Sequence, residues 1–290
     1  LTQLADDMTL FLNDRVSVTN SLAIFDRFYD STGLRLNKQK CEVFLLGNCG
    51  QTNNPPDHVE GLGCIRDSFK ALGIHFSRAW EKSVELNCNE RMKNIKIMLN
   101  IWLQRNLTLK GKIVVLKSLI FPKLLYVCNN VFVPDNLIKQ IEDLTFKFLW
   151  GHKPAKIKKD TIIGDIHQGG LKMPLFSAVI QSSRVMWVKR IFEAKESKWS
   201  MLALQMMNVT EFDLHCRSDP KYVHAKTPFY EHILKSWYTY QAGKPITKQE
   251  VHQEVIWNNI FIQKEHKQFL LKKWQDKGII FLQDLIGKNN

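Results

Sequence analysis

The chain has 290 residues, of which 44% are hydrophobic and 24% are charged, and this balance favours a folded core over intrinsic disorder. Its formal net charge is +13, which points to a polyanionic partner, most often nucleic acid. Residues 81 to 200 hold most of the excess, with 21 Lys and Arg residues against 10 Asp and Glu residues. A basic helical region that binds nucleic acid is therefore the first expectation.

Nothing in the sequence predicts secretion or a membrane partner. No apolar run reaches the roughly 18 residues that a membrane-spanning helix needs. The six cysteines include no CxxC pair, a pattern that fits a reducing compartment. We therefore expect an intracellular protein, with nucleus and cytoplasm left unresolved.

The first structural element expected is a β-hairpin over residues 1 to 12. Two β-prone runs flank a short acidic centre there, so Asp6 and Asp7 are predicted to lie at its tip. An amphipathic helix follows, because apolar residues recur three or four positions apart. Its candidate N-cap is Ser17, and Gly33 stands just past its end.

Strands are expected after this helix, at residues 34 to 36, 43 to 46 and 69 to 76. A stretch rich in Gly, Asn and Pro at residues 47 to 56 predicts a loop. The order of hairpin, helix and strands is typical of an α+β fold with a mainly antiparallel sheet. The first predicted domain covers residues 1 to 80.

The apolar spacing becomes helical beyond this domain. One helix is expected from about Val84, and Thr108 begins a second helical stretch, through residue 131, that Pro122 should kink. Asp135 is the predicted cap of a third helix, which ends at Gly151.

The rest of the chain is also predicted to be mostly helical, over residues 176 to 195, 229 to 241 and 249 to 275. The helical part is accordingly divided into residues 81 to 150 and residues 151 to 290. The role of the second of these regions is left open.

The two neighbouring aspartates are the first candidates for chemistry. Enzymes that join nucleotides use two hard divalent cations, and such cations prefer carboxylate oxygens that are held close together. Asp6 and Asp7 would supply a pair of this kind. Adjacent aspartates also favour turn formation without any metal, so the pair by itself leaves both interpretations open.

Further motifs follow the aspartates in a definite order. Leu4-Ala5-Asp6-Asp7 comes first, residues 33 to 42 contain the pattern Asn-x-x-Lys that ends at Lys40, and residues 71 to 74 read Ala-Leu-Gly-Ile. In this order the motifs resemble the Ala-Asp-Asp hairpin, the segment that follows it and the primer-grip hairpin of one family. That family is the reverse transcriptases of non-LTR retrotransposons of the LINE type.

The similarity continues into the helical region. Residues 102 to 113, 117 to 118 and 122 to 124 are similar to the thumb of these enzymes. Residues 148 to 151 and 169 to 174 resemble segments further downstream in their reading frames. The resemblance thus spans roughly residues 4 to 190, and it implies a partial antiparallel polymerase palm followed by a mostly α-helical thumb and C-terminal region.

The resemblance also implies an activity and a set of site residues. The activity would be RNA-directed DNA polymerisation with Mg²⁺ and deoxynucleoside triphosphates. Asp6 would bind metal, Asp7 would be its neighbour with a lesser share, and Lys40 would lie near the incoming triphosphate. Leu72 and Gly73 would shape the hairpin that holds the primer end.

The basic residues of the thumb-like region are expected to contact the phosphates of an RNA template and DNA primer, or of their hybrid duplex. Phosphate contacts are blind to sequence, which suits an enzyme that slides along its product. An ordinary solvated helix face is the alternative interpretation. The residues concerned are Arg105, Lys110, Lys112 and Lys117. A second basic cluster, in a loop, has a partner that could equally be RNA and consists of Lys153, Lys156, Lys158 and Lys159.

The resemblance places the other metal-binding aspartate of the family upstream of Leu1, so we expect the chain alone to be inactive as a polymerase. A non-enzymatic remnant that still binds nucleic acid is the alternative. A third interpretation is an unrelated helical scaffold with a chance hairpin. The oligomeric state is not predicted.

Overall fold

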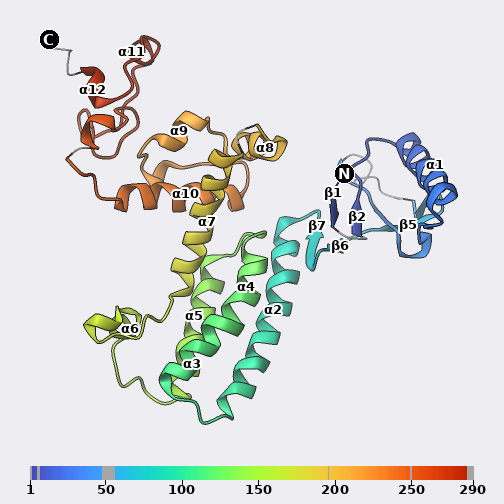
Figure 1. Ribbon diagram of the computed structural model, residues 1–290, viewed down its shortest axis with the longest axis horizontal. Coiled ribbons are helices and arrows are strands. Elements are labelled where there is room, and N and C mark those ends of the chain that lie inside the picture. Colours follow the sequence, from blue (N-terminus) through green and yellow to red (C-terminus); the bar gives the residue numbers. More distant parts are fainter. Residues whose placement is uncertain (1, 5–6, 48–55, 195, 249, 286–290) are drawn as a thin grey trace. The chain divides into compact units, whose positions relative to one another are not determined.

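The computed structural model describes residues 2–4, 7–47, 56–194, 196–248 and 250–285. It has an α+β fold that is mostly helical, with small mixed and antiparallel sheets near the N-terminus (Figure 1). The chain divides into two compact units, Leu1–Glu90 and Arg91–Asn290. Among the described helices, none is both long and apolar enough to cross a bilayer.

The N-terminal unit holds the strands, one long helix and the start of another. Its elements are β1 (Thr2–Leu4), β2 (Asp7–Thr9), α1 (Arg15–Thr32), the short 3₁₀ helix η1 (Lys38–Lys40), β3 (Glu42–Phe44), β4 (His58–Val59), β5 (Leu62–Ile65), β6 (Ser68–Ala71), β7 (Ile74–Ser77) and α2 (Trp80–Leu103), which continues into the second unit.

The described strands form three small sheets. The hairpins β1–β2 and β6–β7 are antiparallel, and β5 pairs with β4 antiparallel and with β3 parallel. The expectation of a mainly antiparallel arrangement therefore holds in part, because one of the pairings is parallel. The hairpin predicted over residues 1 to 12 is confirmed as β1–β2.

Several predicted strand boundaries are wrong. Residues 34 to 36 form no strand, and residues 69 to 76 form the hairpin β6–β7 rather than one strand. The β4–β5 pair was missed, because its turn consists of Glu60 and Gly61, both with positive φ. Glu-Gly is not one of the dipeptides that typically mark such a turn.

The helix α1 begins earlier than predicted. Its N-cap is Asp14, whose carboxylate accepts a hydrogen bond of 2.7 Å from the backbone N–H of Ser17. Ser17, the predicted N-cap, therefore lies inside the helix, and its backbone N–H is the donor that Asp14 caps. The predicted end is confirmed, because Gly33 adopts a left-handed conformation with φ +73° and its N–H donates to the carbonyl of Tyr29.

The C-terminal unit is helical. After the end of α2 come α3 (Leu109–Val115), the π-helical segment η3 (Leu116–Ile120), α4 (Phe121–Cys128), α5 (Asp135–Trp150), α6 (Lys159–Ile163), η4 (Ile166–Gln168), α7 (Phe176–Glu193), α8 (Lys198–Met207), α9 (Glu211–His215), η5 (Pro220–Tyr222), α10 (Pro228–Gly243), η6 (Val251–Gln253), α11 (Lys272–Gln275) and α12 (Leu282–Leu285).

The helical predictions for residues 108 to 151 hold with small shifts. Thr108 is the N-cap of α3, and the helix becomes π-helical just before Pro122, where the N–H of Phe121 donates to the carbonyl of Leu116. Proline lacks the N–H of a regular helix, so an irregularity at this point is expected. The stretch ends at Cys128.

The limits of α5 are also close to the prediction. Pro134 occupies the cap position, so the predicted cap Asp135 is instead the first helical residue. Gly151 ends the helix as predicted, in a left-handed conformation with φ +58°.

Helix α7 contributes to two of the hydrophobic clusters of this unit. Phe176 and Ile180, near the start of α7, pack with α2, α3, α4 and α5. Val188 and Ile191, nearer its end, pack with α8 and α10. Figure 1 shows α7 running from the α3–α5 bundle to α10.

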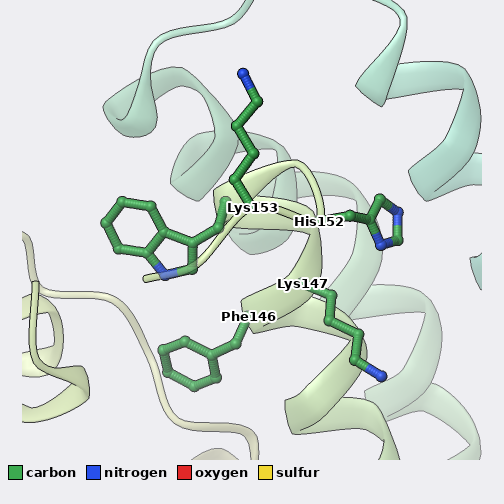
Figure 2. Close-up of a pocket in the computed structure, with 5 residues that line it drawn as sticks. Phe146, Lys147, His152 and Lys153 are labelled. Carbon is green, nitrogen blue, oxygen red and sulfur yellow. The ribbon is translucent and has the colours of Figure 1, made fainter. Parts of the chain in front are cut away.

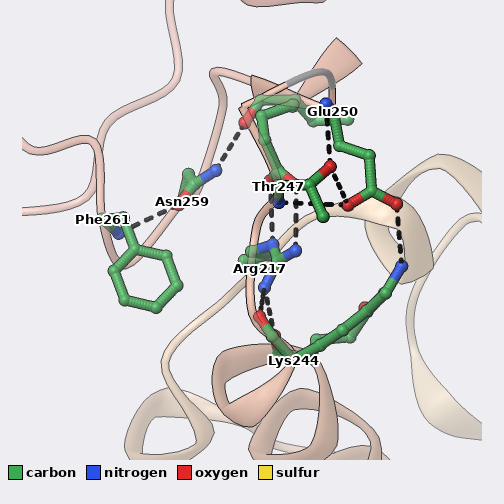
Figure 3. Close-up of polar contacts among 9 residues, drawn as sticks. Arg217, Lys244, Thr247, Glu250, Asn259 and Phe261 are labelled. Carbon is green, nitrogen blue, oxygen red and sulfur yellow. Dashed lines mark hydrogen bonds and ion pairs between the residues drawn. The ribbon is translucent and has the colours of Figure 1, made fainter. Parts of the chain in front are cut away.

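The helix predicted for residues 249 to 275 is wrong, since most of this segment is irregular. Polar side chains hold it in place (Figure 3). Arg217, 5% exposed, forms an ion pair of 2.8 Å with Glu254 and also donates to the carbonyl oxygens of Gln241 and Lys244. These contacts come from distant parts of the chain, so no local periodicity could reveal them.

Candidate nucleic-acid interface

The β1–β2 hairpin presents Asp7 at the start of its second strand. The antiparallel register pairs Leu4, the last residue of β1, with Asp7, the first residue of β2. The Asp7 side chain is exposed, so a hydrated cation such as Mg²⁺ can reach its carboxylate oxygens. Asp6 lies outside the described residues. Within the described residues, no group of three or more His, Cys, Asp or Glu side chains could hold a metal ion.

Lys40 lies at the end of a single helical turn. The turn η1 follows Asn37, whose carbonyl accepts a hydrogen bond of 3.0 Å from the Lys40 N–H. The strand β3 follows almost directly and pairs with β5. The Lys40 side chain is exposed, so its ammonium group can reach a phosphate, as an ordinary solvated lysine also could.

Leu72 and Gly73 form the turn between β6 and β7. The register pairs Ala71 with Ile74, so the loop has two residues. Both have positive φ, +48° at Leu72 and +76° at Gly73, as in the type I′ turns that fit the twist of a hairpin. Leucine is disfavoured in this conformation. The Leu72 side chain is 51% exposed, at the tip of the hairpin. Outliers of this kind cluster at functional sites.

Two side chains of α2 bind the β6–β7 hairpin through the backbone of His75. Asn87, 2% exposed, accepts a hydrogen bond from the N–H of His75 and donates to the His75 carbonyl. Ser83 donates to the same carbonyl at 2.6 Å. The sequence did not indicate either residue. Asparagine is unfavourable within a helix unless its side chain has a role, but α2 contains four asparagines, so this signal does not single out Asn87.

An aromatic contact joins this hairpin to the β3 sheet. Phe69 lies with its ring centroid 4.9 Å from that of Phe44 and 5.3 Å from that of Phe76. Arg78 lies over the Phe44 ring and donates a hydrogen bond of 3.2 Å to the carbonyl of Leu45. The segment after Lys40 and the Leu72–Gly73 turn therefore belong to one packed structure.

Three of the four predicted thumb residues are exposed in the C-terminal unit. Arg105 lies in the loop between α2 and α3, with its guanidinium 5.3 Å from the Trp102 ring centroid. Lys110 and Lys117 are both exposed and are seven positions apart in a continuous helical stretch. A separation of two helical turns places them on one face, which suits contacts with successive phosphates.

Lys112 has a different environment. Its ammonium group donates to the carbonyls of Phe148 at 3.2 Å and Leu149 at 3.0 Å, and it lies 5.6 Å from the Phe148 ring centroid. The last carbonyls of a helix lack partners within it, and a cation there is favourable. Lys112 thus caps the end of α5, and the nucleic-acid contact predicted for it stays a prediction.

A hollow of about 450 Å³ on the C-terminal unit was also missed. Side chains of α2 and α4 line it, and they combine basic, amide, aromatic and apolar groups: Arg91, Asn94, Ile95, Ile97, Met98, Lys123 and Tyr126. The Lys123 ammonium lies 3.4 Å from the Met98 sulfur. Residues from two helices meet here, and sequence spacing alone cannot pair them.

The basic loop after α5 is only partly neutralised by neighbouring carboxylates. Lys159 forms an ion pair of 3.2 Å with Glu142. Burial raises the pKa of Glu142, but hydrogen bonds from the Ser177 N–H and from Lys159 outweigh it and hold the pKa below its usual value. In the described part of the chain, no carboxylate forms an ion pair with Lys153, Lys156 or Lys158. These three ammonium groups are exposed.

The comparison with known families adds no assignment, since no protein-family model matches this sequence.

Proposed function

We propose that this chain is the C-terminal part of an RNA-directed DNA polymerase of the non-LTR retrotransposon type. The enzyme would add deoxynucleotides to the 3′ hydroxyl of a DNA primer on an RNA template. The observation that carries the proposal is the β1–β2 hairpin, whose antiparallel register sets the exposed Asp7 at the start of the second strand. The order of the motifs that follow supports it.

The turn at Leu72 and Gly73 is the second support. The turn presents an exposed leucine in a conformation that leucine disfavours, and buried Asn87 holds the neighbouring strand through His75. An apolar tip of this kind suits contact with the sugars and bases at the end of a primer. Lys40 would contact the triphosphate of the incoming nucleotide.

Asp6 and Asp7 would hold the magnesium ions that such enzymes use, together with a carboxylate from the preceding part of the enzyme. Bound there, the two ions would stabilise the attacking and leaving oxygens of the in-line displacement. Exposed carboxylate oxygens are ligands that Mg²⁺ prefers, so the chemistry of Asp7 fits this role.

Primer extension tests the polymerase proposal. The enzyme would be expressed from its full reading frame and given an RNA template, a DNA primer and Mg²⁺. We expect Asp6→Ala to reduce extension by roughly a thousandfold or more and Asp7→Ala to reduce it less. Asp26→Ala, which removes an exposed carboxylate of α1, is the matched control. Extension at the wild-type rate by the Asp6→Ala, Asp7→Ala enzyme would overturn the proposal.

Binding of a hybrid duplex tests the thumb on the chain as it stands. The slope of log affinity against log salt concentration should fall in magnitude by about 0.9 for each phosphate contact removed. We therefore expect a change of about 1 to 2 for Lys110→Ala with Lys117→Ala. Lys139→Ala, an exposed lysine of α5, should leave the slope unchanged. Wild-type binding that does not respond to salt would contradict the proposed phosphate contacts.

A non-enzymatic remnant is the second candidate, and the basic excess of residues 81 to 200 favours it equally. The two experiments separate the candidates. Salt-dependent hybrid binding combined with no extension by the full-length enzyme would favour the remnant.

A further inference from the structure

The end of helix α5 carries a small hollow with aromatic walls and a basic rim. Its volume is about 250 Å³, and its lining residues are Phe146, Lys147, Trp150, His152 and Lys153. Phe146 and Trp150 are four positions apart on α5, so they share one face of the helix. Both rings are partly exposed.

The backbone that shapes this hollow is firmly held. The N–H of His152 donates to the carbonyl of Lys147 at 3.1 Å, and the N–H of Gly151 donates to that of Phe148 at 3.3 Å. This is the Schellman pattern of helix ends. His152 also has a positive φ of +64°. Together with the Lys112 cap described above, these contacts fix the backbone at the end of α5 as far as Lys153.

The basic groups at the rim are available to a partner. Lys147, His152 and Lys153 are exposed, and among the described residues no carboxylate forms an ion pair with any of them. Figure 2 shows the side chains of Lys147 and Lys153 extending in different directions, away from the Phe146 ring. Ammonium groups that diverge in this way cannot enclose one small anion, whereas they can meet separate phosphates along a strand.

We propose that this hollow binds single-stranded nucleic acid, with a base against Phe146 and Trp150 and flanking phosphates on Lys147 and Lys153. Aromatic faces and lysines in alternation are the usual means of holding an unpaired strand. In a duplex the bases are stacked on one another and offer no free face. The hollow is smaller than the roughly 300–1,000 Å³ of most small-molecule sites, which suits one base rather than an enclosed nucleotide.

The adjoining loop extends the same surface. Lys156 and Lys158 follow Lys153 and are exposed, so the strand has further cations to follow beyond the base. Lys159 lies 4.6 Å from the Phe146 ring centroid and is paired with Glu142. Its ammonium group therefore covers part of the Phe146 ring and is held by Glu142 rather than offered to the strand. The inference goes beyond the proposed polymerase chemistry and requires neither Asp6 nor Asp7.

The test measures binding of the 290-residue chain to fluorescein-labelled oligouridylate and oligothymidylate of about 12 nucleotides, with fluorescence anisotropy. A blunt RNA/DNA hybrid is the comparison ligand. We expect Phe146→Leu with Trp150→Leu to weaken single-strand binding by roughly tenfold and to leave hybrid binding unchanged. Trp150→Phe should retain most of the affinity, because it keeps an aromatic face.

A second variant covers the case in which the leucine variant fails to fold. Lys147→Glu with Lys153→Glu alters exposed side chains only and should also weaken single-strand binding by roughly tenfold or more. Lys198→Glu with Trp199→Leu is the matched control, since both residues are exposed and lie on α8. This control should bind as the wild type does.

Three results would overturn the inference. The first is unchanged single-strand affinity in the charge-reversal variant, and the second is a loss of hybrid affinity in either variant as large as its loss of single-strand affinity. The third is displacement of the oligonucleotide by a polyglutamate peptide at a concentration similar to that of unlabelled oligonucleotide needed for the same displacement. Failure here leaves the polymerase proposal standing, because hybrid binding through Lys110 and Lys117 and primer extension are measured separately. Preference for the uridylate over both the thymidylate and oligodeoxyuridylate would indicate an RNA strand, because the last comparison changes only the 2′-hydroxyl.

Discussion

Two helices of equal length behave very differently in the two units. Both α1 and α7 have 18 residues. No residue of α1 is buried, whereas α7 buries six: Phe176, Ile180, Arg184, Val185, Val188 and Ile191. Both sequences carry apolar residues at helical spacing, so this spacing indicates a helix without indicating whether the rest of the chain covers its apolar face.

The same contrast extends to the units as wholes. Among the described residues, the buried hydrophobic side chains of the N-terminal unit are Val59, Leu62, Ile74, Val84 and Cys88, and the others lie in the C-terminal unit. On α1, Val16 is 67% exposed and Ile24 is 57% exposed. The N-terminal unit therefore depends more on turns and polar contacts, and the C-terminal unit on its core.

The largest effect is expected at Arg184, in the C-terminal unit. Its side chain is fully buried, donates to the carbonyls of Cys128, Asn129 and Val131, and lies over the Phe229 ring. Arg184→Met removes one donor from each of these carbonyls and leaves the Asn129 carbonyl with the indole N–H of Trp187, which should lower the free energy of unfolding by about 3–5 kcal/mol. Urea denaturation followed by circular dichroism measures the loss.

Arg190→Met is the control for this variant, because Arg190 is exposed on the same helix. Its expected effect is within about 0.5 kcal/mol. Equal stability of the Arg184 and Arg190 variants would show that the buried guanidinium does not stabilise the C-terminal unit.

Asn87 should give the largest polar effect in the N-terminal unit. Asn87→Ala removes the hydrogen bonds to both backbone groups of His75 and should cost about 2 kcal/mol. Backbone hydrogen exchange should become faster in β6 and β7, because the hydrogen bonds that attach them to α2 are lost. It should stay unchanged in α10. Asn100→Ala, at an exposed position of α2, is the matched control; a similar rise in that variant would contradict the assignment.

A smaller effect, of opposite sign, is expected at Leu72. Asparagine tolerates the left-handed conformation better than leucine does, so Leu72→Asn should stabilise the chain by about 0.5–1 kcal/mol. The same change should impair primer extension by the full-length enzyme if the apolar tip contacts the primer. Increased stability with unchanged extension would make Leu72 an ordinary strained turn residue.

The smallest effect concerns His232 and pH. Burial and the nearby Arg184 guanidinium lower the pKa of His232 below its ordinary value of 6.5. The unfolded chain therefore takes up the proton first, so this contribution to stability is complete above about pH 6.5 and is lost as the pH falls towards the folded-state pKa. His232→Gln should flatten the dependence of unfolding free energy on pH below 6.5. An identical pH profile for this variant would contradict it.

Sequence patterns predicted elements that local chemistry determines. The left-handed glycines Gly33 and Gly151 end α1 and α5 as expected, and Thr108 caps α3. The same patterns did not predict the irregular segment after residue 249, because contacts between distant residues, such as Arg217 and Glu254, hold this segment in place.

The structure bears on the exposure of the predicted site residues, and their roles stay predictions. Asp7, Lys40, Lys110 and Lys117 are all exposed, as residues that contact a ligand should be. The capping role of Lys112 could not be foreseen, because the carbonyls of Phe148 and Leu149 come from another helix. Spacing along the chain identifies the residues of a helix face but not the element that lies against it.

Helix α7 contributes side chains to two hydrophobic clusters. The parts of the C-terminal unit that contain these two clusters therefore cannot be separated as independent domains. This 18-residue helix is about 27 Å long, and it packs against the α3–α5 bundle with one end and against α10 with the other. Limited proteolysis should accordingly release this region as one resistant fragment. A truncation within α7 would leave each half with an exposed apolar surface and a tendency to aggregate.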